Sequence, residues 1–245
     1  MKALILAAGY ATRLYPITSH KPKALLTVKG KPIIEYIIAK LEHLKGLEQI
    51  LIVTNHRYMK EFESWLRDYP ALLPVKLIDD GSINENDKRG SIGDIAFAIK
   101  EKQIEDDLLV IGGDNMFSFG LDKFVEFAGG LDSCNLVGTF NLNGKFRLNK
   151  FGVVKLDMHN RVIEFQEKPS VYTGSSLVAM CIYFFPKEKL QLIDEYINQQ
   201  NSTDQSGDYI SWLSKRDTVY GYTFDEGAWL DIGDIEAYTE AVFTF

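Results

Sequence analysis

Short apolar segments alternate with segments of helical periodicity in the first half of the chain. The apolar segments are rich in β-branched residues and cover residues 2–7, 49–53, 75–78 and 108–111. After the first of them, apolar residues recur at helical spacing between Ile33 and Leu44, and Pro32 suits the first position of a helix. This alternation predicts an α/β fold with a Rossmann-like, mostly parallel sheet and helices on both faces.

The second half of the chain follows a different pattern. Strand-like segments separated by turns cover residues 135–140, 152–155, 161–167 and 178–185. They predict a smaller mixed or antiparallel region. Helices are expected at about 187–198 and from about 235 to the last residue, with a mobile polar loop at 198–207.

Length, composition and charge narrow the class of protein. A chain of 245 residues with 46% hydrophobic residues can form one large domain, and its net charge of −7 argues against a nucleic-acid partner. There is no signal peptide before the first strand and no apolar run long enough to cross a bilayer, so we expect a cytoplasmic protein without a membrane partner. Cys134 and Cys181 lie in apolar segments and are interpreted as small buried residues in a reducing compartment.

A loop of small residues follows the first apolar segment. Its small residues are Ala7, Ala8, Gly9 and Ala11. They let the backbone approach a ligand closely, and successive N–H groups of a tight turn can bind an anion. Arg13 and Lys23 would add positive charge suited to phosphate. The alternative is a surface loop with two solvated cations, but ligands of parallel sheets gather at this end of a strand.

The same residues resemble the signature of a known family. LAAGYATRLYPIT at 6–18, KPKALL at 21–26 and GKPIIEY at 30–36 resemble the sugar-phosphate nucleotidyltransferases, with similarity to the glucose-1-phosphate thymidylyltransferases. Many members have a second glycine at Ala11, where we expect alanine to be tolerated with a negative φ. The resemblance assigns nucleotide binding to this loop and to the following lysine, namely Ala7, Ala8, Gly9, Ala11, Thr12, Arg13 and Lys23.

Two aspartates are candidate metal ligands. Asp114 follows an apolar strand in VIGGDN, and Asp231 lies in WLDIGD. Either residue alone could be a turn residue before a helix. Together they resemble the two metal-binding aspartates of the family, and one or two carboxylates are the usual protein ligands of Mg²⁺. The resemblance also places Asn115 at the sugar phosphate.

The motif QEKP at 166–169 resembles the Glu-Glu-Lys-Pro element that binds the acceptor substrate in the family. Glu167 can accept hydrogen bonds from sugar hydroxyls, and Lys168 can pair with a phosphate; the alternative is a charged strand end before a proline. Gly152 matches a glycine that lets the backbone approach the sugar. Hexose-specific members commonly have Thr-Gly where this chain has Met180 and Cys181, so a narrower pocket is expected and the acceptor substrate stays open.

Residues 79–94 connect a strand to a helix and are the candidate base-recognition segment. Gly90 and Ser91 match the position at which relatives hold the base and ribose. Thymidylyl- and uridylyltransferases read the base with a glutamine near the position of Asp80. A carboxylate only accepts hydrogen bonds, so Asp80 would suit a base edge with N–H donors, such as cytosine N4 or guanine N1 and N2.

The resemblance therefore implies one domain over residues 1–245, with a nucleotide-binding half at about 1–133, a sugar-phosphate-binding half at about 134–245 and no C-terminal β-helix. In the implied reaction, a sugar 1-phosphate attacks the α-phosphorus of a nucleoside triphosphate in line, with Mg²⁺ held by the two aspartates. Arg13 would hold pyrophosphate, Lys23 the α-phosphate and Lys168 the acceptor phosphate. The predicted catalytic residues are Arg13, Lys23, Asp114 and Lys168.

Two other functions remain open from the sequence. The first is cytidylyl transfer to a non-sugar phosphate such as phosphocholine, whose quaternary ammonium group would need an aromatic cage. The second is a non-catalytic regulator that binds nucleotide or sugar phosphate on the same fold. The sequence is compatible with a homo-oligomer and fixes neither the base nor the acceptor substrate.

Overall fold

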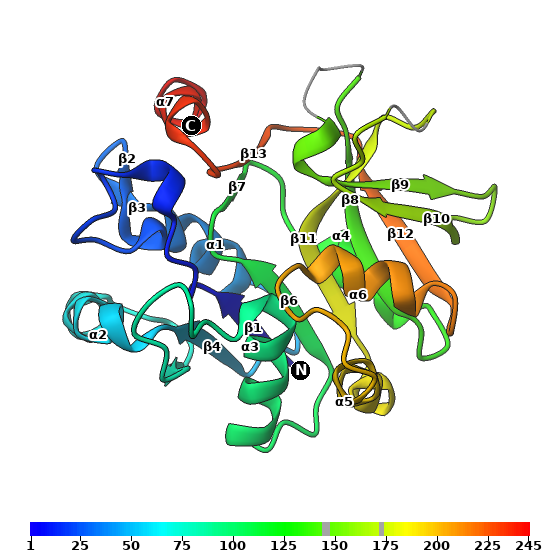
Figure 1. Ribbon diagram of the computed structural model, residues 1–245, viewed down its shortest axis with the longest axis horizontal. Coiled ribbons are helices and arrows are strands. Elements are labelled where there is room, and N and C mark those ends of the chain that lie inside the picture. Colours follow the sequence, from blue (N-terminus) through cyan, green and yellow to red (C-terminus); the bar gives the residue numbers. More distant parts are fainter. Residues whose placement is uncertain (144–147, 172–173) are drawn as a thin grey trace.

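A single mixed sheet runs through both halves of the protein in the computed structural model, which describes residues 1–143, 148–171 and 174–245 (Figure 1). Within these residues the sheet has nine strands. They are β1 (Lys2–Leu6), β4 (Gln49–Thr54), β5 (Val75–Asp79), β6 (Leu108–Gly112), β8 (Asn135–Asn141), β9 (Gly152–Leu156), β10 (Val162–Glu167), β11 (Leu177–Phe185) and β12 (Val219–Phe224).

The order of the strands separates a parallel part from a mixed part. Strands β6, β1, β4 and β5 are parallel neighbours, as the alternating pattern of the first half predicts. Strand β11 runs antiparallel to β6 and joins the two parts; it also pairs antiparallel with β8 and β9. The α/β fold class is therefore confirmed, with the mixed region built onto the same sheet rather than beside it.

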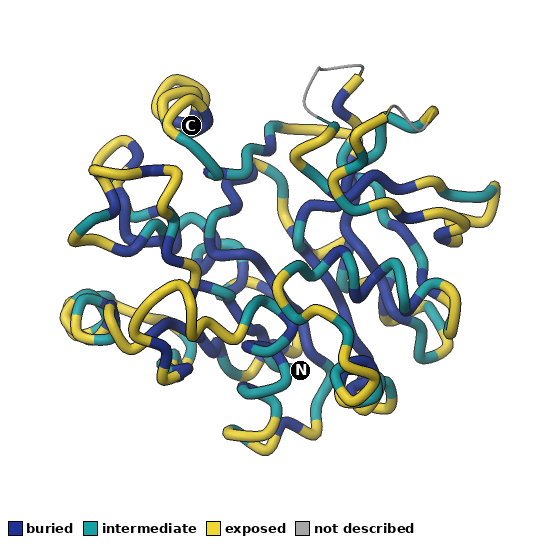
Figure 2. The backbone as a smooth tube through the Cα atoms, viewed as in Figure 1, coloured by how far each residue is buried: buried dark blue, intermediate teal, exposed yellow. Residues whose placement is uncertain are grey.

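Helices cover both faces of the sheet. They are α1 (Ile33–Leu41), α2 (Met59–Asp68), α3 (Gly90–Glu101), α4 (Asp122–Gly129), α5 (Gln191–Asn198) and α6 (Ser206–Leu213). Helix α7 (Ile235–Thr244) packs away from this sheet, with Ala241 in a separate core that includes Leu14 and Ile33. The side chains of β1 alternate between two cores: Ala3 and Ile5 pack with α1, α2 and α4, whereas Leu4 packs with α3, α5 and α6. Figure 2 shows the resulting buried centre beneath exposed loops. Among the described residues, no helix has the length and apolarity needed to cross a bilayer.

Three local predictions differ from the structure. Helix α1 ends at Leu41, so Leu44 is buried in the following turn instead of in the helix. Pro32 lies just before the helix, where it pairs as part of β3 (Lys31–Pro32) with β2 (Thr27–Val28). The polar segment 198–207, expected to be a mobile loop, includes the first two residues of α6, and within it the carbonyl of Thr203 accepts a 3.0 Å hydrogen bond from the N–H of Ile92.

A small antiparallel pair of strands joins distant parts of the chain. Strand β7 (Asn115–Phe117) follows β6, and β13 (Trp229–Asp231) precedes α7. In this pairing Asp231 lies opposite Asn115, and the N–H of Ile232 donates to the carbonyl of Asp114 at 2.9 Å. The two aspartates predicted as metal ligands are therefore brought together from positions more than a hundred residues apart.

Candidate active site

Two neighbouring cavities lie beyond the carboxyl ends of β1 and β6. The loop cavity, of about 290 Å³, is lined by the small-residue loop after β1 together with Lys23 and Asp114. The strand cavity, of about 210 Å³, is lined by residues near the ends of β10 and β11 together with Asp231. Ser91, Cys181 and Asp204 line both cavities, so the two form adjoining parts of one site.

The small-residue loop forms one wall of the loop cavity, as the sequence predicts. The loop residues that line it include Ala8, Gly9, Ala11, Thr12 and Arg13. Ala7 does not line the cavity; it is packed in the core.

The expectation of a negative φ at Ala11 is wrong, since its φ is 49°, in the left-handed region. The carbonyl of Ala11 accepts hydrogen bonds from the backbone of Leu14 at 3.0 Å and from Thr18 Oγ1 at 2.8 Å. These contacts fix the turn that begins the short 3-10 helix η1 (Thr12–Leu14). Left-handed backbone costs an alanine about 1–2 kcal/mol, so the surrounding turn must stabilise this conformation.

Lys23, Asp114 and Asp231 form a buried charged centre. The short 3-10 helix η2 (Lys23–Leu25) positions Lys23, whose Nζ lies 2.6 Å from Asp114 Oδ2. Burial lowers the pKa of Lys23, but the charges of Asp114 and Asp231 outweigh burial and leave the pKa above its ordinary value. Burial, and secondly the charge of Asp114, raise the pKa of Asp231 to about 7. The centre therefore carries more negative charge than Lys23 alone offsets.

The residues of this centre fit a hard divalent cation. In the described part of the chain, no group of three or more His, Cys, Asp or Glu side chains could hold a metal alone. Mg²⁺, however, is commonly held by one or two carboxylates together with water and substrate phosphates. Asp231 Oδ1 is buried without a hydrogen-bond partner, as expected for an oxygen that awaits a ligand.

Asn115 has a structural position rather than the predicted contact with sugar phosphate. Its side chain is only 1% exposed. Its Nδ2 donates to the carbonyl of Gly112 at 3.1 Å, and its Oδ1 accepts from Trp229 Nε1 at 2.6 Å. These bonds hold β7 against β13, which corrects the prediction: the side chain positions the neighbouring aspartates and does not line either cavity.

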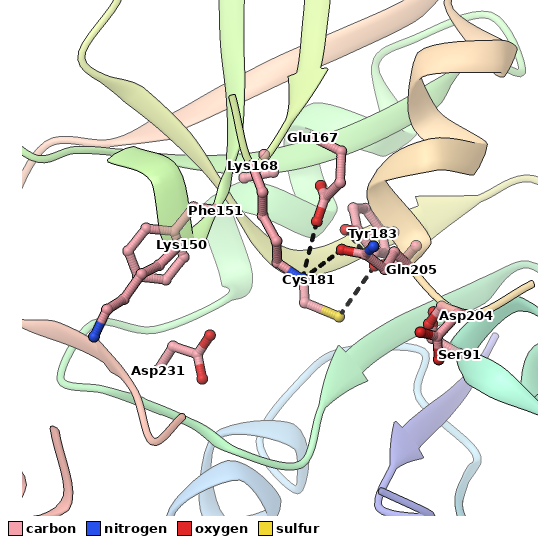
Figure 3. A pocket seen from close by; sticks show the side chains of 13 residues that line it. Ser91, Lys150, Phe151, Glu167, Lys168, Cys181, Tyr183, Asp204, Gln205 and Asp231 are labelled. Carbon is pink, nitrogen blue, oxygen red and sulfur yellow. Dashed lines mark hydrogen bonds and ion pairs between the residues drawn. The ribbon is translucent and has the colours of Figure 1, made fainter. Parts of the chain in front are cut away.

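Glu167 and Lys168 lie together in the strand cavity, at the end of β10 (Figure 3). Lys168 Nζ is 3.4 Å from Glu167 Oε1 and donates a hydrogen bond to Gln205 Oε1. Burial raises the pKa of Glu167, and the charge of Lys168 opposes this shift. The pair presents one carboxylate and one ammonium group to the cavity, as the sequence motif predicts.

Gly152 lines the same cavity, but the structure gives a further reason for a glycine. A Cβ at this position would lie 2.4 Å from the ring of Phe165 and 2.9 Å from Glu167 Oε2. Gly207 of α6 faces the same carboxylate, since its Cβ would lie 1.8 Å from Glu167 Oε2. Both glycines therefore make room for the carboxylate of Glu167, in addition to any approach of a ligand to the backbone.

Cys181 occupies the boundary between the two cavities. The register of β11 shifts between Ala179 and Tyr183, and Cys181 has a φ of 53°, which favours glycine. Its Sγ lies 3.8 Å from Ser206 Oγ. Burial raises the pKa of this thiol to about 12, so it stays neutral. Cys134 and Cys181 are both free and half-buried, less buried than the sequence suggests.

Helix α3 begins between the cavities. Gly90 has a φ of 78°, and a Cβ there would lie 2.5 Å from the carbonyl oxygen of Thr203. The N–H and the hydroxyl of Ser91 both donate to the carbonyl of Asp204, at 3.2 and 3.0 Å. Gly90 and Ser91 both line the loop cavity. The donors of Ser91, however, are already bound to the carbonyl of Asp204, in the loop before α6.

Asp80, the predicted base-reading residue, does not line either cavity. It is 2% exposed and accepts hydrogen bonds from the N–H and Oγ of Ser82 at 2.7 and 2.8 Å. A neighbouring carboxyl group, that of Asp94, does line the loop cavity and is 6% exposed. The sequence analysis missed it, although Asp94 follows Ser91 by three residues and so shares its face of the helix.

The fold and the two cavities define an α/β protein with a buried acidic centre at the carboxyl ends of its parallel strands. Comparison with known proteins places the chain more closely: it belongs to the nucleotidyl transferase family, whose model matches residues 2–244.

Relatives in sequence and structure agree with this family. The chain is 30% identical over 233 residues to a bifunctional protein GlmU of Methanocaldococcus jannaschii, covering 95% of this chain and 51% of that protein. It is 28% identical over 249 residues to a UTP–glucose-1-phosphate uridylyltransferase of Synechocystis, covering 99% and 62%. The chain thus spans about half the length of the first relative and somewhat more of the second. A UDP-glucose pyrophosphorylase solved with UDP-glucose has the same fold, with a TM-score of 0.82 at 22% identity and coverage of 99% and 97%.

Proposed function

We propose that this protein transfers a nucleotidyl group from a nucleoside triphosphate to a sugar 1-phosphate and releases pyrophosphate. The observation that carries the proposal is the position of the charged centre: Asp114 lines the loop cavity and Asp231 lines the strand cavity. Anions bound in the two cavities would therefore meet at this centre, which gives the proximity that the reaction requires. Family membership and the names of the relatives support the same class of reaction.

In this proposal, the loop cavity binds the triphosphate. The exposed backbone of the loop at Gly9, the guanidinium of Arg13 and the ammonium of Lys23 provide donors and positive charge for phosphate oxygens. Lys23 is part of the charged centre, with its Nζ 2.6 Å from Asp114 Oδ2, so we assign it to the α-phosphate and Arg13 to the pyrophosphate that leaves.

The charged centre would hold the metal ion. Members of the family generally use divalent metal ions, and we propose Mg²⁺ held by Asp114 and Asp231. When bound, such an ion bridges phosphate oxygens and offsets the charge that develops on them. The chain itself orients the two phosphates for in-line attack, and the N–H of Ile232 fixes the backbone of Asp114 for this task.

In the strand cavity, Lys168 would bind the acceptor phosphate and Glu167 the sugar hydroxyls. Lys150 also lines this cavity, with its Nζ 2.5 Å from Asp234 Oδ2, so Lys168 is the cation that we assign to the acceptor phosphate. A quaternary ammonium group such as that of phosphocholine would need an aromatic cage in this cavity. The aromatic side chains among its described lining residues are Phe151 and Tyr183, and the hydroxyl of Tyr183 is bound to Ser206 Oγ at 3.0 Å.

The test is a screen for pyrophosphate release. The purified protein is incubated with Mg²⁺, with each of the common nucleoside triphosphates and with a panel of sugar 1-phosphates or phosphocholine. We expect release that requires one triphosphate and one sugar 1-phosphate together, and the nucleotide sugar should be detected by mass spectrometry. Activity with phosphocholine alone would contradict the choice of acceptor substrate. Binding of both ligands without any release would instead identify a regulator.

A further inference from the structure

A pair of carboxyl groups lies in the wall of the loop cavity, apart from the charged centre. Asp94, in the second turn of α3, lines the cavity, and Asp80 follows strand β5. The two side chains are hydrogen-bonded to each other, with Asp94 as the proton donor. We call Asp80 and Asp94 the acid pair.

The acid pair has no cation bound to its carboxyl groups. In the described part of the chain, neither carboxylate lies within 4.0 Å of a lysine or arginine nitrogen. Arg89 approaches, but its Nε donates to the backbone carbonyl of Asp80 at 2.6 Å, and its guanidinium lies 4.1 Å from the ring centroid of Phe97. Two adjacent buried carboxylates without a cation repel each other, so one of them retains its proton.

The proton belongs to Asp94. Asp80 is the better site for the negative charge, because the N–H and hydroxyl of Ser82 donate to it, and Tyr10 in turn donates to Ser82 Oγ at 3.0 Å. Burial, and secondly the charge of Asp80, raise the pKa of Asp94 to about 8, which Arg89 opposes. Near neutral pH Asp94 is therefore mostly a neutral acid.

A neutral Asp94 leaves one hydrogen-bonding atom for a ligand. One oxygen of Asp94 carries the proton that is donated to Asp80, and within the described residues no donor is bound to the other oxygen of this side chain, which lines the loop cavity. This oxygen accepts hydrogen bonds and cannot bind a phosphate, which also presents only acceptors near neutral pH. The group that it suits is an N–H in a water-poor part of the cavity, as at the edge of a nucleobase.

We propose that Asp94 is a base-recognition residue, which in its neutral form accepts a hydrogen bond from an N–H of the nucleobase while its own proton binds Asp80. The inference rests on the proposed function and moves base recognition from Asp80 to Asp94. It also makes binding dependent on pH, because loss of the shared proton places a second negative charge beside a triphosphate. Arg89 is the cation that acts on the pair, and the other titratable groups that line the loop cavity are those of Tyr10, Arg13, Lys23, Glu85, Lys88, Asp114, Cys181 and Asp204.

The experiment measures the affinity of the full chain for each nucleoside triphosphate with Mg²⁺ by calorimetry, between about pH 6.5 and about pH 9.5. Asp94→Asn is the central variant, because an amide keeps a donor for Asp80 and an acceptor for the base without a titrating proton. Asp94→Leu removes both polar groups. Glu85→Gln is the matched control, since it neutralises another carboxylate that lines the same cavity.

For the preferred triphosphate, wild-type affinity should fall above about pH 8, approaching tenfold per pH unit, because one bound proton is required. Asp94→Asn should bind with a flat profile over the same range, and Glu85→Gln should keep the wild-type profile. Asp94→Leu should bind on the order of tenfold more weakly than wild type below about pH 8 and show no decline above it, because an N–H of the base is left unpaired and no proton is lost.

Three results would overturn the inference in distinguishable ways. If Asp94→Asn keeps the wild-type decline with pH, Asp94 is not the titrating group. If Asp94→Leu binds the 2′-deoxy or 3′-deoxy nucleotide as well as wild type does, its contact is with the ribose and not with the base. If neither wild type nor any variant binds a triphosphate at any pH, the proposed function fails, and base recognition by Asp94 fails with it.

Discussion

The two carboxylate pairs of this protein, Asp114 with Asp231 and Asp80 with Asp94, are both buried but differ in what balances their charge. An ammonium group lies 2.6 Å from Asp114, whereas Asp80 is hydrogen-bonded by the N–H and hydroxyl of a serine. The charge of Lys23 lowers the pKa of Asp231, yet burial and Asp114 still raise it to about 7; in the other pair the pKa of Asp94 rises to about 8. In the first pair an ammonium group offsets part of the negative charge, whereas in the second the two acids share a proton.

The difference follows from the elements that carry each pair. Asp114 and Asp231 lie at the ends of the short strands β7 and β13, where a lysine from η2 can reach them. Asp80 and Asp94 lie between the end of β5 and the first turns of α3, where the neighbouring Arg89 is turned to a backbone carbonyl. Two acids in one cavity can therefore take opposite roles according to the donors around them.

The largest effect that distinguishes the pairs should come from Asp114→Ala. Loss of a preorganised charge-stabilising group should lower kcat on the order of 10²-fold or more. The measurement is the steady-state rate with saturating substrates and Mg²⁺, with circular dichroism to confirm the fold. A kcat near that of wild type would remove Asp114 from the proposed centre, and the contrast between the two pairs would no longer hold.

The next largest effect should show that the two cavities bind different substrates. Lys168→Ala should raise the KM for the sugar 1-phosphate on the order of tenfold or more, since a charge-assisted hydrogen bond to phosphate contributes about 1.5–3 kcal/mol. The KM for the triphosphate should change much less, because Lys168 lines the strand cavity and not the loop cavity. Equal changes in both constants would contradict this assignment.

The next prediction concerns how the free energy of unfolding depends on pH because of the acid pair, Asp80 and Asp94. The pKa of Asp94 is raised in the folded protein, so the folded state binds more protons than the unfolded state between about pH 4 and about pH 8. Wild-type stability should therefore fall as pH rises through this window. Asp94→Asn removes the penalty and should raise the free energy of unfolding by at least about 1 kcal/mol at pH 8, or about 2–4 °C in Tm. The advantage should shrink towards pH 4; an advantage that is constant with pH would point to packing instead.

The smallest of these effects should come from Ser82→Ala. The substitution removes the hydroxyl that donates to Asp80 and leaves the backbone N–H of residue 82 in place. We expect a loss of about 1 kcal/mol in the free energy of unfolding near neutral pH, measured by urea denaturation. Unchanged stability would indicate that the backbone donor alone is sufficient to hold the charge of Asp80.

The sequence predicts the strands of the parallel part of the sheet and the residues that directly follow those strands. Alternating apolar segments identify β1, β4, β5 and β6, and the residues just after β1 and β6 are the loop and Asp114. The sequence pattern does not predict the left-handed backbone of Ala11 or the hydrogen bonds of Asn115 and Asp80. Their partners lie either far away in the sequence or in the same local turn, and neither kind of contact produces a periodic signal. Thr18 fixes the turn at Ala11, Trp229 binds Asn115, and Ser82 binds Asp80.

The pairing of β13 with β7 affects the order in which the parts of the site form during folding. The residues that line the loop cavity are complete once the segment before α6 has folded, since they extend no further than Asp204. Asp231 joins Asp114 only when β13 has paired with β7, a contact across more than a hundred residues that is slow to form. During synthesis, therefore, we expect a chain to complete the residues of its loop cavity before Asp231 joins Asp114 at the charged centre.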